Sequence, residues 1–142
     1  MTQEEEKLVL IDLCGRLPYG VKCCYDILSG EIKIDTLICI NKVIIGQDNY
    51  WDIYFENCDE DIPLETVKPY LRPLSSMSEE ERKEYNYLYY QVPIQRSGGN
   101  AYRDTKMVEA LHIDWLNKNM FDHRGLIPKG LALEAPKDMY NN

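Results

Sequence analysis

The chain has 142 residues, of which 44% are hydrophobic and 28% are charged, and its net charge is −8. This length and composition indicate a single domain over residues 1–142 that can bury a core without metals or disulfides. No apolar run approaches the roughly 20 residues that span a bilayer, and the acidic N-terminus is unlike a secretory signal, so we expect a cytoplasmic protein without a membrane segment.

Acidic residues are concentrated in the first half of the chain. Residues 1–65 hold 14 acidic and 5 basic side chains, and residues 46–65 hold seven acidic and no basic ones. This balance argues against broad contact with a nucleic-acid backbone. It permits a basic partner, although solubility alone is the simpler explanation.

The five cysteines do not form a metal-binding pattern. Their number is odd, and no pair has the C-x-x-C spacing of zinc sites. We therefore expect buried free thiols in a reducing compartment, no metal and no cofactor.

A capping box of Thr2 and Glu5 predicts a first helix over Gln3–Cys14. Gly15 is the expected stop, because glycine tolerates the left-handed conformation that ends helices. The apolar side of this helix is predicted to comprise Leu8, Leu10, Ile11 and Cys14.

Short alternating runs separated by turn residues predict a small antiparallel sheet or barrel over residues 20–72. The alternation shifts phase after Asp35, which indicates a bulge or a break. Pro69 and Pro73 exclude a regular helix around them, so that segment is expected to be an extended edge or a crossover. In the run NYWDIYFE one face is apolar, and the opposite face consists of Asp52, Tyr54 and Glu56.

Two helices are predicted in the second half of the chain. Ser78 and Glu81 form another capping box, and the helix that follows ends at Pro93. A further helix is expected over Thr105–Met120, so that the fold class is α+β, with three helices packed on the sheet. The two apolar stripes are predicted to be Tyr85, Leu88, Tyr89 and Val92, then Val108, Leu111, Trp115 and Leu116.

The adjacent residues Asp122, His123 and Arg124 have two interpretations. Basic side chains near a helix C-terminus interact with its free carbonyl groups, and Gly125 then supplies a stop, so helix termination is the simpler one. The alternative is a small hydrolase in which a carboxylate orients His123, or in which His112 acts as the base. A partly buried structural role is the simpler interpretation of His112.

The segment from Gln95 to Thr105 is interpreted as a loop between the two helices, with Gly98-Gly99 as its flexible point. Its Gly98-Gly99 pair could form a backbone nest for a phosphate, which Arg96 and Arg103 would then contact. The known phosphate-loop signatures are missing from the sequence. A small nucleotide ligand is therefore the alternative interpretation of this segment.

Four of the eleven tyrosines lie in the helix after Ser78. Tyr87 and Tyr90 fall off its apolar stripe and are expected to face solvent or a partner. Tyrosine provides a large contact area with few rotatable bonds, which suits protein interfaces. Together with the face of Asp52, Tyr54 and Glu56, these residues predict contact with a protein partner or a second copy of the chain.

Two segments resemble a known family. VKPYLRPLSSMSEEE (Val67–Glu81) and IDWLNKNMFDHRGLIPKGLALEAPKDMY (Ile113–Tyr140) are similar to small proteins of unassigned activity from phages, prophages and mobile elements of gut anaerobes, and DLCGRLPYGVKC looks like that family's opening. The resemblance implies a bacterial cytoplasm and a phage-related origin, and it supplies no catalytic residue. The predicted function is a non-enzymatic, phage-related accessory protein that binds a macromolecular partner or itself; a nucleotide binder and a small hydrolase are the alternatives.

Overall fold

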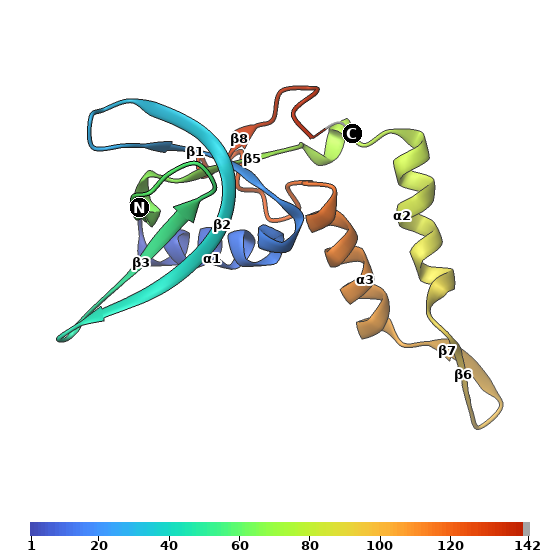
Figure 1. Cartoon of the computed structure of the whole chain (residues 1–142). Helices are drawn as coiled ribbons and strands as arrows, with labels where there is room; N and C mark the ends of the chain where they lie inside the picture. Colours follow the sequence, from blue (N-terminus) through green and yellow to red (C-terminus); the bar gives the residue numbers. More distant parts are fainter. Residues whose placement is uncertain (141–142) are drawn as a thin grey trace.

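The computed structural model describes residues 1–140, so that Asn141 and Asn142 of the predicted domain lie outside the described residues. The predicted α+β class is confirmed: an N-terminal helix and a sheet are followed by two further helices (Figure 1). Within the described part of the chain, no helix has the length and apolar character needed to cross a bilayer. The helices are α1 (Gln3–Arg16), α2 (Glu79–Gln91) and α3 (Thr105–Lys118).

The main sheet has six strands in the order β4-β3-β2-β1-β5-β8 and stays open, so the barrel alternative is wrong. All neighbouring strands run antiparallel except β5 and β8, which are parallel. β8 comes from the C-terminal segment and extends the sheet beyond the predicted range. The strands are β1 (Lys22–Asp26), β2 (Ile32–Ile45), β3 (Asp48–Phe55), β4 (Ile62–Pro63), β5 (Lys68–Leu71) and β8 (Leu133–Glu134).

The bulge predicted in the second strand is present. The register between β2 and β3 shifts between Leu37 and Cys39, a few residues after Asp35. The proline-containing segment is extended, as expected, but it is not an edge strand. Pro69 in β5 pairs with Cys23 in β1, and β8 covers the other side of β5.

The core lies between the sheet and α1. On the sheet, Tyr25 stacks on Phe55 with ring centroids 4.1 Å apart, and Leu37 and Ile53 are buried beside them. Of the cysteines only Cys23 is buried, so the expectation of buried thiols is wrong for Cys14, which is exposed.

Helix α1 begins as predicted, with both hydrogen bonds of the Thr2–Glu5 capping box. Its predicted apolar side is wrong, because Ile11 is half exposed and Cys14 is exposed. The helix also continues past Gly15, which therefore does not act as the predicted stop. The residues that α1 buries are Val9, Asp12, Leu13 and Arg16.

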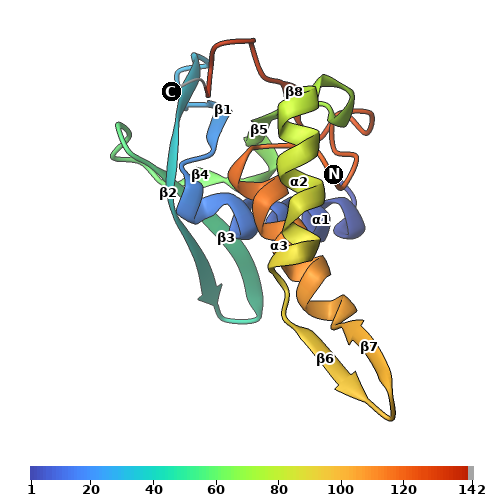
Figure 2. The same cartoon turned by 90° about the vertical axis from the view of Figure 1, so that its right-hand side faces the viewer.

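Helices α2 and α3 form an antiparallel pair that projects from the sheet, with a two-stranded hairpin at its far end (Figures 1 and 2). We call residues 79–118 the arm. The hairpin consists of β6 (Ile94–Ser97) and β7 (Asn100–Arg103), so the segment predicted to be a flexible loop is ordered. Gly98 and Gly99, with φ angles of 58° and 86°, form its turn, since glycine adopts these angles readily.

The arm is joined to the sheet through a small second core. Trp115 and Phe121 stack with ring centroids 5.7 Å apart, and Tyr85 and Leu88 of α2 pack against them. Tyr89, predicted to belong to the apolar stripe, is 42% exposed, and α2 has no fully buried residue. The arm therefore buries mainly its base, and Val92 next to the hairpin is the buried residue at its other end.

Candidate functional site

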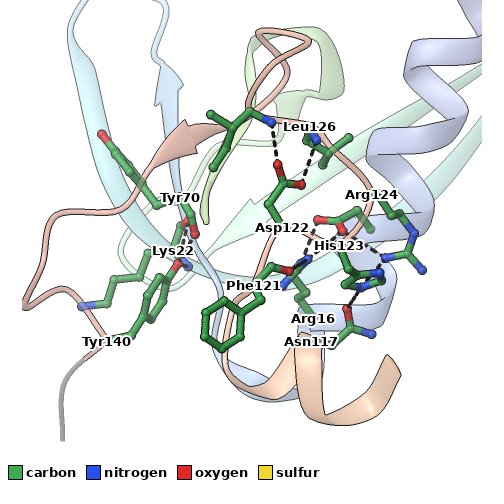
Figure 3. Close-up of polar contacts among 12 residues, drawn as sticks. Arg16, Lys22, Tyr70, Asn117, Phe121, Asp122, His123, Arg124, Leu126 and Tyr140 are labelled. Carbon is green, nitrogen blue, oxygen red and sulfur yellow. Dashed lines mark hydrogen bonds and ion pairs between the residues drawn. The ribbon is translucent and has the colours of Figure 1, made fainter. Parts of the chain in front are cut away.

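Two charged residues lie in the middle of the buried face of α1. Asp12 and Arg16 are both 0% exposed and form an ion pair with Nε–Oδ2 2.8 Å and Nη2–Oδ1 3.0 Å. Arg16 Nη2 also donates to the carbonyl oxygen of Phe121 at 2.7 Å (Figure 3). The pair thus links the first helix to the segment that follows α3.

His123 and Arg124 join the same network from the C-terminal side. Arg124 Nη1 donates to Asp12 Oδ1 at 3.0 Å, and His123 Nε2 lies 2.8 Å from Asn117 Oδ1 in α3 (Figure 3). A Cβ atom on Gly15 would lie 2.8 Å from Asn117 Nδ2, so a glycine lets α1 approach α3 this closely. We call the following residues the polar junction: Asp12, Arg16, Asn117, His123 and Arg124.

Asp122 has a separate role beside the polar junction. Its carboxylate accepts hydrogen bonds from the backbone N–H groups of Leu126 at 2.8 Å and Ile127 at 2.9 Å (Figure 3). Leu126 is fully buried, so the first of these bonds satisfies an amide that water does not reach. Asp122 therefore holds the turn after it and does not orient His123.

The three adjacent residues therefore do not end helix α3 in the predicted way. The helix ends at Lys118, and the left-handed residue that turns the chain is Met120, with φ 61°, so Gly125 is not the stop. His123 and Arg124 bond side chains of other residues, and the free carbonyl of Asn119 accepts a hydrogen bond from Arg72.

The surroundings of His123 keep its ring neutral. Burial, together with the neighbouring guanidinium groups of Arg124 and Arg16, lowers the pKa of this imidazole to about 4. With a neutral histidine, the carboxylates of Asp12 and Asp122 balance the two guanidinium groups. The polar junction together with the neighbouring Asp122 therefore carries no net charge, which suits a buried structural network.

The lowered pKa of His123 makes stability depend on pH. The unfolded ring binds a proton below its ordinary pKa of 6.5, whereas the folded ring resists protonation down to about pH 4, so stability falls as pH falls through this window. Relative to His123→Gln, the wild type is expected to lose about 1–2 kcal/mol more between pH 7 and pH 4.5, since partial exposure screens part of the shift. Urea denaturation at both pH values measures this; equal losses would contradict it.

The second histidine is also engaged in packing. The ring of His112 stacks on Tyr85, with centroids 4.0 Å apart, and its Nε2 lies 3.1 Å from the Tyr85 carbonyl oxygen. Across residues 1–140, neither histidine hydrogen-bonds a carboxylate, hydroxyl or thiol group. The geometry thus provides no assembled pair of base and nucleophile around His112 or His123.

Two hollows mark the surface near the base of the arm. The larger, about 620 Å³, contains the bidentate ion pair of Arg72 and Glu81, with N–O distances of 2.8 and 2.9 Å. Arg72 lowers the pKa of Glu81, so these two charges are already paired, and the other charged residues of the lining are Glu134, Lys137 and Asp138. The smaller hollow, about 400 Å³, is lined by Leu74, Met77, Arg82, Tyr85, Asn86, Leu116 and His123.

The residues predicted to receive a nucleotide do not converge on a cavity. Gly98 and Gly99 stand in open space at the end of the hairpin, and Arg96 is exposed. Arg103 is held by the arm itself: its Nε donates to the Val92 carbonyl at 3.1 Å, and its guanidinium lies over the rings of Tyr89 and Tyr90. Both hollows described above are lined by other residues.

The predicted outward face of β3 is only partly exposed. Glu56 is exposed and Tyr54 is half-buried, but Asp52 is 8% exposed, because β4 pairs alongside it through Pro63. Burial and the nearby carboxylate of Asp61 raise the pKa of Asp52. Asp52 is therefore unavailable to a partner, contrary to the prediction.

The far end of the arm presents a cluster of exposed aromatic rings. Tyr87 and Tyr90 are 62% and 64% exposed, as expected, and the ring of Tyr89 meets that of Tyr90 edge to face at 5.2 Å. Arg103 lies 4.8 and 5.2 Å from the centroids of Tyr89 and Tyr90. Exposed apolar side chains nearby are Ile94, Tyr102 and Met107.

Sequence patterns missed Asp12 and Arg16, which lie at the centre of the polar junction. The available signal was their spacing of four residues, which suits an ion pair on one helix face. Such a spacing is usual on solvent-exposed helices as well, so it does not by itself indicate burial.

Comparison with known proteins finds no matching family model, no matching curated protein and no matching solved structure.

Proposed function

We propose that this chain is a non-enzymatic binding protein that docks a protein partner through the far end of its arm. The proposal is supported mainly by the exposed tyrosine cluster of α2, carried on a helix pair that projects from the sheet (Figure 2). A soluble protein rarely exposes several adjacent aromatic rings without a contact that covers them. Tyrosine and arginine are also the side chains enriched at the centres of interfaces.

The closed geometry of the other candidate residues favours binding over catalysis. In the polar junction His123 is neutral and bonded to an amide, and the histidine of the arm, His112, is stacked. The nucleotide alternative has less support, since Arg103 is engaged by tyrosines and by a carbonyl group. The resemblance to phage and prophage proteins adds, within the same proposal, that this binding serves a mobile element.

Site-specific crosslinking tests the proposed function. A photoreactive amino acid is placed at Tyr87, at Tyr90 or, as control, at Leu28, which is 97% exposed on the sheet side. In cells that naturally carry the gene, we expect covalent adducts of defined mass from both arm positions and none from Leu28. Absence of adducts from the arm, or equal adducts from Leu28, would refute a docking role for the arm.

A further inference from the structure

The tip of the arm differs in charge from the rest of this acidic chain. We define the arm tip as residues 87–107, which contain three basic side chains and one acidic side chain. Arg96 and Lys106 are exposed there. Because like charges repel, two arm tips are not complementary in charge. A surface that combines acidic and apolar side chains would be complementary to an arm tip.

The opposite end of the molecule offers a surface of that kind. We define the acidic edge as residues 44–61, where the β2–β3 hairpin projects on the other side of the sheet from the arm (Figure 1). It contains six acidic side chains and no basic one. Ile44 and Ile45 are exposed at 65% and 61%, next to the exposed carboxylate of Asp48.

The acidic edge also has unpaired backbone. β3 pairs with β2 over its whole length, whereas β4 covers only Asp52 and Ile53. In the described part of the chain, residues 48–51 therefore have a strand neighbour on one side only. The strands β6 and β7 likewise pair only with each other. Open strand edges accept another strand through their backbone hydrogen bonds, and an isolated hairpin is stabilised when a neighbour is added.

From this complementarity we infer that the partner is a second copy of the chain: the β6–β7 hairpin of one copy docks against the acidic edge of the next. The inference rests on the proposed function and names its partner. Basic and aromatic groups of the arm tip meet acidic and aliphatic groups of the acidic edge, and open strand edges are present on both sides. Because the two surfaces differ and lie on opposite sides of the molecule, the contact is head to tail, and copies can add successively.

The test uses the full chain with one surface removed at a time. The arm variant carries Tyr90→Ser, Ile94→Ser and Arg96→Glu, and the edge variant carries Ile44→Ser, Ile45→Ser and Asp48→Lys; all six residues are exposed. A control variant, Ile32→Ser with Ile34→Ser, removes exposed isoleucines elsewhere on the sheet. Circular dichroism and thermal unfolding verify that each variant folds.

Sedimentation velocity from about 1 µM to about 1 mM then measures the mass in solution. We expect the wild type and the control to grow beyond a dimer as concentration rises, and each surface variant to associate at least about 30-fold more weakly. An equimolar mixture of the two surface variants should form a heterodimer and nothing larger, because one intact arm tip and one intact acidic edge remain. Salt at about 1 M should weaken the contact.

Three results would overturn the inference. If the wild type stays monomeric at every concentration tested, a second copy of the chain is excluded as the partner. Crosslinks from Tyr87 to another protein would then still support the proposed function. Association that the arm variant abolishes but the edge variant preserves would indicate contact between two arms. A mixture of the two surface variants that remains monomeric would exclude head-to-tail docking.

Discussion

Replacing Asp12 with asparagine is expected to lower the free energy of unfolding by about 3–5 kcal/mol. The substitution keeps the size of the side chain but removes the negative charge that faces Arg16 and Arg124. Arg16 is fully buried, so its guanidinium would remain in the interior without a counter-charge. Urea denaturation with an unchanged m-value would measure this loss.

The companion variant replaces both partners with apolar residues. Asp12→Leu with Arg16→Met is expected to lose only about 1–2 kcal/mol, because the Phe121 carbonyl loses one of its two donors and the partly exposed Arg124 loses its carboxylate partner. The double variant should thus be more stable than Asp12→Asn alone. A loss equal to the sum of the single substitutions would show that the two charges act independently, which contradicts the buried pair.

This pair also explains why the buried face of the first helix was predicted wrongly. Prediction from hydrophobic spacing takes the side of a helix that carries apolar residues as the buried side. Ile11 and Cys14 have this spacing and were therefore predicted to be buried. The chain instead buries a face in which Asp12 and Arg16 stand between Val9 and Leu13. Besides each other, the two charges contact Arg124 and the carbonyl group of Phe121. Both lie more than a hundred residues away in the sequence, so they leave no local signal.

The helix starts were easier to predict than the helix ends. Capping boxes at Thr2 and Ser78 are local, because two residues spaced three apart complete both hydrogen bonds, and both boxes are present in the structure. Helix α3 ends at a buried methionine, Met120, held in the left-handed conformation by its surroundings. Such an ending depends on the tertiary contacts of Phe121 and Arg72, which no local pattern reveals.

The exposed positions of Tyr87 and Tyr90 followed from helical spacing, whereas the hairpin between α2 and α3 did not. Its strands alternate poorly, and none of the residues of β6 is buried, so the usual apolar pattern of a strand is missing. The Gly98-Gly99 turn was the available signal. A hairpin without a buried face gains little stability from its own chain, which is consistent with a role in contacting a partner.

The second large effect is expected at Asp122. Replacing it with alanine removes the acceptor of two backbone amides, one of which belongs to the fully buried Leu126. Unsatisfied buried donors are costly, so we expect a loss of about 2–4 kcal/mol in the free energy of unfolding. Asp122→Asn keeps one acceptor oxygen and is expected to lose about half as much.

A matched control separates this effect from a general loss of negative charge. Asp138 is exposed in the same C-terminal segment, and Asp138→Ala should change stability by less than about 0.5 kcal/mol. Hydrogen exchange adds a local readout, because the amides of Leu126 and Ile127 should lose protection in Asp122→Ala while those of α1 keep theirs. If Asp122→Ala changed neither the free energy of unfolding nor the exchange protection of these amides, Asp122 would not stabilise the turn. A reactive role beside His123 would then be the better explanation.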